Sequence, residues 1–380
     1  MKTSWTRRGK WLCAALLLFA LVATGIYFVP KVANRILGGP ESLSTSPGTM
    51  IRSMALSRNG ELLAAGGSIL ARKGWKRGSG TVYLWNARTG RQLSRIAPVY
   101  THDRTNFIDG FDIYALTISP DAKQIGFSRA VANWTLYDTA TQKQLWQFPS
   151  FIEVAKFSQD GHFIALSSYN HIFIVNARDG RVRTQWKRIS TSNSQDLAWS
   201  PDGAWVATIG PSKINNPIDL HRADNGKFVR RIVSKQNMSG ETLASVTFSS
   251  DSKHLLTASS VGTYDSKDTF DSFAPVRCYD ATTGKLMWEV KTPAFGGADG
   301  MHAAFCDAIF SPDGSLVAAY QYNEGRIFLL DSVTGSIKKT LSLGSAAHST
   351  FYVPPGLIFS PDGKRLFARG KDAILFWDLK

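Results

Sequence analysis

The chain has 380 residues, of which 43% are hydrophobic and 19% charged, and its formal net charge is +15. This length is ample for one large folded core, and no break in composition points to a second domain. Six of the 44 basic residues lie in or beside one amino-terminal segment, so the excess on the rest of the chain is 38 minus 29, or +9. That diffuse positive charge is compatible with binding to an anionic surface or an acidic partner, but it does not require either.

The amino-terminal segment predicts a membrane anchor. Residues 11–29 carry no charge, and Lys2, Arg7, Arg8 and Lys10 precede them. Such a run is just long enough to cross a bilayer as a helix and is longer than the apolar core of an ordinary signal peptide. The cationic end stays in the cytoplasm, which places the rest of the chain on the periplasmic side of a bacterial inner membrane. A cleaved signal peptide, leaving a secreted or periplasmic protein, is the alternative.

Three segments follow from this interpretation. Residues 1–30 form the anchor or signal segment, and residues 31–50 form a linker rich in proline, glycine and serine. The segment 51–380 is the folded domain. The later part of the linker, within 36–50, is expected to supply one strand to that domain.

A short phrase recurs seven times in residues 51–380 and predicts seven β-hairpins. In a Ser-Pro-Asp-Gly sequence, proline fixes φ, aspartate bonds its own backbone and glycine accepts a positive φ. Apolar runs of strand length flank every copy, giving two strands that we call a and b. The copies are Ser57-Arg-Asn-Gly60, Ser119-Pro-Asp-Ala122, Ser158-Gln-Asp-Gly161, Ser200-Pro-Asp-Gly203, Ser249-Ser-Asp-Ser252, Ser311-Pro-Asp-Gly314 and Ser360-Pro-Asp-Gly363.

A second signal follows each hairpin except the last and predicts a tight connection from a strand c to a strand d. An apolar run ends in Asp, Asn or Arg, and a turn residue, nearly always glycine, comes four positions later. The c strands are apolar on both sides, which is typical of strands buried on both faces. The six pairs are Asn86/Gly90, Asp138/Gln142, Asn176/Gly180, Arg222/Gly226, Asp280/Gly284 and Asp331/Gly335.

Seven hairpins with only six c–d turns leave one strand missing. A closed ring takes that strand from the segment before the first hairpin, whereas an open solenoid needs no such exchange. The count therefore predicts an all-β, seven-bladed β-propeller of four-stranded antiparallel blades, preceded by one transmembrane or signal-anchor helix.

The repeats resemble those of the bacterial WD-repeat (WD40-like) family. Phe359-Ser-Pro-Asp-Gly363 followed by Phe376-Trp-Asp378 carries the resemblance most clearly. The resemblance implies a seven-bladed propeller that serves as a binding scaffold. Only Trp85 and Trp377 keep the tryptophan that the family places on strand c, so its buried hydrogen-bond tetrad is not expected in most blades. The stretch Tyr279–Trp288 is similar, more weakly, to pyrroloquinoline-quinone-type propeller repeats.

The spacing between repeats predicts which face of the ring is used. The a–b and c–d turns stay tight, so extra residues enter the b–c and d–a connections, which emerge at the same end of an antiparallel blade. Long loops on a rigid scaffold commonly carry binding sites. The four largest insertions, 66–80, 94–112, 259–275 and 291–306, are expected to form two walls on opposite sides of the channel mouth.

Aromatic and charged residues in these insertions are the candidate partner-binding residues, because such mixtures anchor protein contacts. The competing interpretation is that the aromatics pack their own loops onto the ring and that the dense stretch 72–77 is a solvated basic loop. The candidates are Arg72, Lys73, Trp75, Lys76, Arg77, His102, Arg104, Tyr264, Phe270, Phe273, Phe295 and His302.

The sequence gives little support for an enzymatic or metal-binding function. There is no Gly-x-Ser-x-Gly elbow and no phosphate-binding loop, so no catalytic residue and no cofactor is assigned. His102, His302 and His348 could meet at the channel mouth and ligate a cation, but their spacing does not fix their separation. Metal binding therefore remains unknown. Cys278 and Cys306 form either a disulfide or two buried free thiols.

Two classes of function remain. The first is a membrane-anchored extracytoplasmic scaffold that binds a protein or peptide on the b–c/d–a face, with its ring closed within one chain and no nucleic-acid partner. The alternative is a propeller enzyme, a quinone- or cation-dependent oxidoreductase or lyase, working at the channel mouth.

Overall fold

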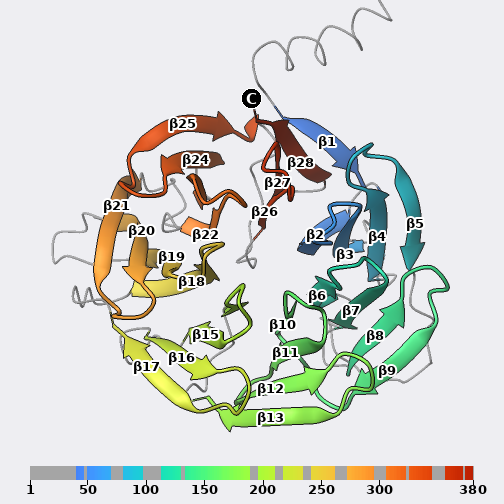
Figure 1. The fold of residues 1–380 in the computed structure, drawn as a ribbon. Coiled ribbons are helices and arrows are strands. Elements are labelled where there is room, and N and C mark those ends of the chain that lie inside the picture. The colour runs from blue at the N-terminus through green and yellow to red at the C-terminus, as the bar shows by residue number, and fades with distance from the viewer. Residues whose placement is uncertain are drawn as a thin grey trace, which may run out of the picture.

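Seven four-stranded sheets stand around a central axis in the computed structural model (Figure 1). The structure describes residues 40–46, 49–69, 80–96, 113–129, 133–188, 196–209, 217–233, 241–261, 272–294, 305–321, 325–344, 356–370 and 373–379. Over these residues the ordered elements are 28 β-strands. This confirms the predicted seven-bladed propeller of four-stranded antiparallel blades.

Six blades are built from consecutive strands, a to d from the axis outward (Figure 1). Blade 1 is β2 (Thr49–Leu56), β3 (Leu62–Ile69), β4 (Thr81–Asn86) and β5 (Gln92–Ile96). Blade 2 is β6 (Ile113–Ile118), β7 (Gln124–Arg129), β8 (Trp134–Asp138) and β9 (Gln144–Phe148). Blade 3 is β10 (Val154–Phe157), β11 (Phe163–Ser167), β12 (His171–Asn176) and β13 (Val182–Lys187).

The second half of the ring repeats the arrangement. Blade 4 is β14 (Leu197–Trp199), β15 (Trp205–Ile209), β16 (Ile218–Arg222) and β17 (Phe228–Ile232). Blade 5 is β18 (Glu241–Phe248), β19 (His254–Val261), β20 (Ser272–Asp280) and β21 (Leu286–Ala294). Blade 6 is β22 (Phe305–Phe310), β23 (Leu316–Gln321), β24 (Arg326–Asp331) and β25 (Ile337–Ser342).

Blade 7 closes the ring with a strand from the other end of the chain. It combines β26 (Leu357–Phe359), β27 (Arg365–Arg369) and β28 (Ala373–Asp378) with β1 (Glu41–Ser44). β1 pairs antiparallel with β28, from Glu41 opposite Phe376 to Ser44 opposite Ala373. The closing strand thus lies inside the segment 36–50 that the missing strand pointed to.

The a–b turns share one hydrogen-bond network in all seven blades. Each turn serine donates its hydroxyl to the side-chain oxygen two residues later, at 2.5–2.7 Å. The same hydroxyl oxygen accepts the N–H of the residue five positions on, at 2.8–3.0 Å. Asn59 replaces aspartate in blade 1 without loss of the contact, because its amide oxygen accepts in the same place.

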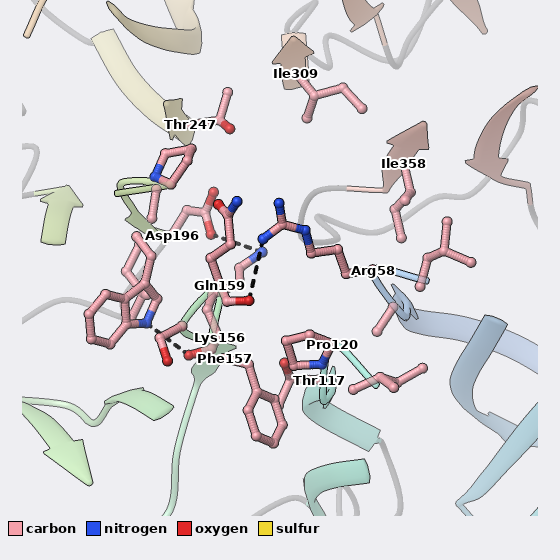
Figure 2. A pocket seen from close by; sticks show the side chains of 18 of the residues that line it. Arg58, Thr117, Pro120, Lys156, Phe157, Gln159, Asp196, Thr247, Ile309 and Ile358 are labelled. Carbon is pink, nitrogen blue, oxygen red and sulfur yellow. Dashed lines mark hydrogen bonds and ion pairs between the residues drawn. The ribbon is translucent and has the colours of Figure 1, made fainter. Parts of the chain in front are cut away.

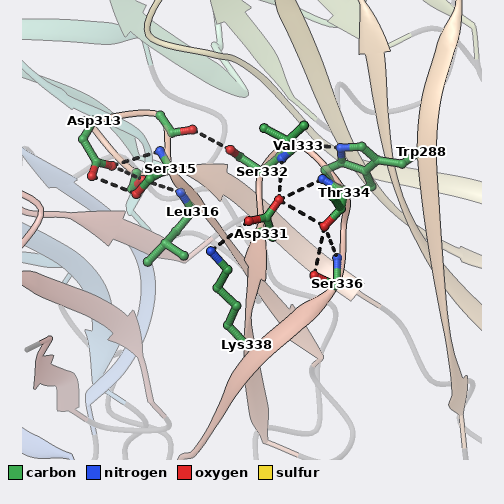
Figure 3. Close-up of polar contacts among 12 residues, drawn as sticks. Trp288, Asp313, Ser315, Leu316, Asp331, Ser332, Val333, Thr334, Ser336 and Lys338 are labelled. Carbon is green, nitrogen blue, oxygen red and sulfur yellow. Dashed lines mark hydrogen bonds and ion pairs between the residues drawn. The ribbon is translucent and has the colours of Figure 1, made fainter.

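The c–d turns lie beside the a–b turns on one face of the ring. In each blade the residue after strand c donates its backbone N–H to a carbonyl of the a–b turn, at 2.6–3.2 Å. In blade 6 the Ser332 hydroxyl adds a 2.6 Å bond to the Gly314 carbonyl, as Figure 3 shows. The fourth residue of every a–b turn has φ between 63° and 75°, the left-handed region that suits glycine. The two kinds of turn thus share a face, as the spacing predicted.

Tryptophans on three outer strands join neighbouring blades. Trp146, Trp186 and Trp288 each lie against the c–d glycine of the next blade. The indole N–H of Trp146 donates to the Ala177 carbonyl at 2.9 Å. That of Trp288 donates to the Ser332 carbonyl, also at 2.9 Å (Figure 3). A positive φ and the absence of a side chain are both needed at these glycines, since an added Cβ would meet the indole ring at 2.7–2.9 Å.

The hydrophobic core lies between the blades rather than at one centre. One cluster joins Ile218 and Leu220 of blade 4 to Val246 and Leu255 of blade 5. Burying strands b and c on both faces explains why their sequences do not alternate. Cys278, in strand c of blade 5, is a free thiol in this layer, and burial raises its pKa to about 12.

The predicted anchor segment, residues 1–30, lies outside the described residues. Among the residues that are described, no helix is long and apolar enough to cross a membrane. The anchor therefore stays a prediction from the sequence.

Candidate functional site

The predicted partner-binding residues lie almost entirely outside the described part of the chain. Phe273 is placed in β20, opposite Val261 of β19 and Pro293 of β21. The other candidates fall in the segments 70–79, 97–112, 262–271 and 295–304, which the structure does not describe. Their role remains a prediction.

The described residues that border these segments do show where the insertions begin. In blade 5 the four strands have 8, 8, 9 and 9 residues, against 3, 5, 5 and 5 in blade 4. The added pairs, such as Glu241 with Val261 and Ser272 with Ala294, lie at the ends away from the a–b and c–d turns. Part of the inserted sequence therefore extends the sheet of blade 5 toward the b–c/d–a side.

A cavity of about 400 Å³ occupies the axis of the ring. The inner strands of all seven blades contribute to its wall, and the residues at the starts of several a–b turns line it as well (Figure 2). This volume lies at the lower end of the range for small-molecule pockets, roughly 300–1,000 Å³. Its wall gathers ionisable groups from blades 1, 3, 4 and 6.

The side chains around the cavity form layers when each blade is counted back from its turn serine. The residue two positions before the serine lines the cavity in every blade: Ala55, Thr117, Lys156, Ala198, Thr247, Ile309 and Ile358. Lys156 is the single charged member of this layer, and its side chain is 48% exposed. Its Nζ lies 3.8 Å from Oδ1 of Asp196, which is 7% exposed (Figure 2).

Arg58 and Gln159 border the cavity where it reaches the a–b turns (Figure 2). Arg58 belongs to the turn of blade 1, and its Nη1 donates to the Gln159 backbone oxygen of blade 3 at 3.3 Å. The contact joins blades that are not neighbours, since blade 2 lies between them. A second positive charge is thereby held near the one on Lys156.

Two buried carboxylates form the layer four positions before the turn serine, and both join neighbouring blades. Oδ2 of Asp196 accepts the backbone N–H of Val246 at 3.2 Å, and Oδ2 of Asp307 accepts that of Leu357 at 2.8 Å. Ser245, at the same position in blade 5, accepts the N–H of Ala308 at 3.1 Å. These contacts link strand a of one blade to strand a of the next.

Burial dominates the electrostatics of this pair. Loss of hydration raises the pKa of Asp307 to about 7, and the nearby charge of Asp196 adds to the rise. Burial also raises the pKa of Asp196, which the Lys156 ammonium and two backbone N–H groups partly offset. Near neutral pH the cavity thus holds two cations and less negative charge than its two carboxyls suggest.

Sequence reasoning missed this layer. The signal was present, because alignment of the seven copies on the turn serine puts Lys156 in a column of otherwise uncharged residues. A second column contains two aspartates among serine, alanine, valine and glycine. Loop lengths, on which the prediction of the binding face rested, contain no information about either column.

Metal chemistry gains no support from the described residues. No group of three His, Cys, Asp or Glu side chains that could hold a metal ion occurs among them. His102, His302 and His348 lie outside the described segments, so their convergence stays untested.

Comparison with known proteins supports the fold and the repeat type. No protein-family model matches the chain. An uncharacterized WD repeat-containing protein of Synechocystis is 27% identical over 156 residues, which is 40% of this chain and 42% of that protein. The chain thus spans less than half the length of this curated relative.

Solved structures match over nearly the whole ring. A chain of the Kuenenia stuttgartiensis hydrazine synthase has a TM-score of 0.65 at 14% identity, covering 88% of this chain and 97% of its own. A chain of the mitotic checkpoint complex has a TM-score of 0.65 at 18% identity, covering 90% and 92%. At these identities the matches show the fold alone.

Proposed function

Because the chain is a WD40-like β-propeller, we propose that it is a membrane-anchored scaffold that binds a protein or peptide partner outside the cytoplasm. The partner docks on the b–c/d–a face of a ring that acts as a single chain. The general role of an interaction scaffold follows from the fold and the WD-repeat relative. The anchor, the compartment and the docking face are the proposed parts.

The segregation of turns and insertions is the observation that carries the proposal. Both kinds of tight turn lie on one face, where hydrogen bonds join them in the six blades that have both. All the long connections leave from the other end of the strands, and blade 5 already extends its sheet there. A rigid ring with variable loops at one face is the usual arrangement for a binding surface.

The entry point of the closing strand is consistent with this orientation. Glu41 pairs with Phe376, near the end of β28 that adjoins the a–b turn of blade 7. The chain from the proposed anchor therefore reaches the ring on the a–b/c–d side. A ten-residue linker spans at most roughly 35 Å, so the tight turns face the membrane and the long loops face away from it.

Crosslinking from membranes tests the docking face. Segments 70–79 and 262–271 are replaced separately by short glycine-serine linkers, which leaves the strands β3, β4, β19 and β20 intact. We expect either replacement to remove a partner that the intact protein recovers after crosslinking. The same replacement of 210–216, a shorter b–c connection in blade 4, is the matched control.

Point variants sharpen the result. Trp75→Ala and Phe270→Ala should each weaken partner recovery if aromatic side chains anchor the contact. Equal recovery by the parent protein, both linker replacements and both point variants would rule out this face as the docking surface.

A further inference from the structure

The central cavity has the features of a second, chemically distinct site on the side of the ring opposite the proposed docking face. Its wall combines two cations, Lys156 and Arg58, with apolar side chains from all seven blades. Ile309 and Ile358 are the bulkiest apolar members of the layer that lines the cavity in every blade. A few convergent polar groups in an apolar hollow are the usual makeup of a small-molecule site.

The Lys156 ammonium is incompletely satisfied. Its carboxylate neighbour among the described residues is Asp196, at 3.8 Å, whereas a charge-assisted hydrogen bond is about 2.7–2.9 Å long. An ammonium has three donors, and half of the side chain is exposed to the cavity. An anion that enters the cavity can therefore pair with the Lys156 ammonium without first breaking a tight ion pair.

Arg58 provides a second cation from blade 1, two blades away from Lys156. Its Nη1 donates to the backbone oxygen of Gln159 at 3.3 Å, and both terminal nitrogens donate to the side-chain oxygen of Gln159. Figure 2 shows the guanidinium extending into the space that Lys156 also enters. A guanidinium has five N–H donors, so those that Gln159 does not use remain for a carboxylate. Blades 1 and 3 thus each supply one cation to the same cavity.

The rest of the wall limits what the anion can be. Thr117 and Thr247 offer hydroxyls, while Ile309 and Ile358 add apolar surface. The deeper carboxyls of Asp196 and Asp307 oppose a multiply charged anion. A ligand with one negative charge and an apolar body satisfies the cations, the walls and the volume together.

We propose that the axial cavity binds an organic monocarboxylate, with the carboxylate between Lys156 and Arg58 and the apolar body against Ile309 and Ile358. The carboxylate belongs either to a free small acid or to the carboxyl end of a peptide. The site is independent of the partner docking proposed for the opposite face.

Calorimetric titration of the purified full-length protein with hexanoate tests the proposal, with hexanamide as the uncharged probe of the same shape. N-acetyl-leucyl-leucine and its carboxamide test the peptide source in the same way. We expect hexanoate or the dipeptide acid to bind and both amides to fail. Binding of hexanoate alone assigns a free acid, and stronger binding of the dipeptide acid assigns a peptide end.

Lys156→Met and Arg58→Gln separate charge recognition from nonspecific uptake. Each is expected to weaken carboxylate binding about ten- to a hundredfold, the effect of losing one charge-assisted hydrogen bond. Lys187→Met removes an exposed lysine from the outer strand of the same blade and should leave binding unchanged. Thermal melting of each variant verifies folding, and Arg58→Gln keeps the test valid if Lys156→Met destabilises the inner strands.

The pH profile adds a readout that a purely structural role would not move. A bound carboxylate disfavours ionisation of Asp307, so affinity should rise as pH falls through about 7. Asp307→Asn should flatten that rise. No binding of either acid by the parent protein, or equal binding by the parent, Lys156→Met and Arg58→Gln, overturns the proposal.

Discussion

His221 stands at the strand-c position that tryptophan occupies in blades 1 and 7. Its ring stacks on Trp186 of blade 3 with 4.8 Å between centroids, and it is 9% exposed. Nδ1 of His221 and the indole nitrogen of Trp186 both lack a hydrogen-bond partner. The junction of blades 3 and 4 therefore relies on ring stacking alone at this point. At the corresponding junctions of blades 2–3 and 5–6, Trp146 and Trp288 each add a hydrogen bond.

Acid should loosen this junction. Burial lowers the pKa of His221 below its usual 6.5, so the unfolded chain binds a proton more readily and stability is lost as pH falls below about 6.5. His221→Phe should abolish a loss on the order of 1 kcal/mol between about pH 7.5 and 5. Urea unfolding across that range measures it, with exposed His162→Gln as control; parallel profiles for His221→Phe and the parent would contradict the assignment.

Asp307 should act in the opposite direction. Its folded pKa is raised to about 7 from 3.8, so the folded state holds the proton that the unfolded chain has released. The destabilisation that the buried Asp307 carboxyl causes is absent below about pH 4. It grows as pH rises through 7 and reaches roughly a few kcal/mol of unfolding free energy. Asp307→Asn keeps an acceptor for the Leu357 N–H and should be more stable than the parent at about pH 8. A stability difference that does not change with pH would show that burial does not perturb this carboxyl.

At the scale of elements, the turn glycines serve two separable purposes. Gly203 and Gly226 have φ of 73° and 70°. A Cβ at Gly203 meets nothing within 4 Å, whereas at Gly226 it meets the Trp186 ring at 2.9 Å. Backbone conformation alone requires the first glycine, and conformation together with inter-blade packing requires the second.

Alanine substitution should separate these terms. Gly203→Ala carries only the left-handed strain and should cost roughly 1 kcal/mol. Gly226→Ala must also displace an indole and should cost roughly 2–3 kcal/mol. Chemical unfolding of both variants gives the comparison, and equal costs would mean that the tryptophan contact adds nothing.

At the scale of the whole molecule, stability depends on the junction that β1 makes. Leu43 is 7% exposed and belongs to a cluster with Ile374 and Phe376 of blade 7 and Trp85 of blade 1. It is the side chain through which a four-residue strand contacts both ends of the ring.

Leu43→Ala should therefore destabilise the protein by roughly 2–4 kcal/mol, the range for a leucine removed from a core. Leu93→Ala, on the outer strand of blade 1 and 47% exposed, is the control and should change stability little. Thermal and urea unfolding measure both. A similar small effect for the two variants would show that the ring does not depend on its closing strand.

The sequence predicted the architecture because local turn chemistry repeats with the fold. Ser-Pro-Asp-Gly and the c–d glycines fix hairpins without long-range information, and the one missing strand located β1. The candidate site was harder to anticipate. Loop length predicts where variable residues leave the ring, but Tyr264 and His302 lie outside the described residues. Lys156 could not be recognised from hydrophobic periodicity. A channel wall accepts both polar and apolar side chains, so a lysine at this position does not break the strand pattern.

The pairing of β1 with β28 sets an order of events during synthesis. β1 leaves the ribosome before any blade exists, and its partner Ala373–Asp378 is made after the other six blades. Until β28 is made, β1 and β27 both lack the strand that lies between them. An unpaired strand edge can pair with another chain. A chain that ends before residue 373 therefore has six complete blades but leaves β1 without its partner strand.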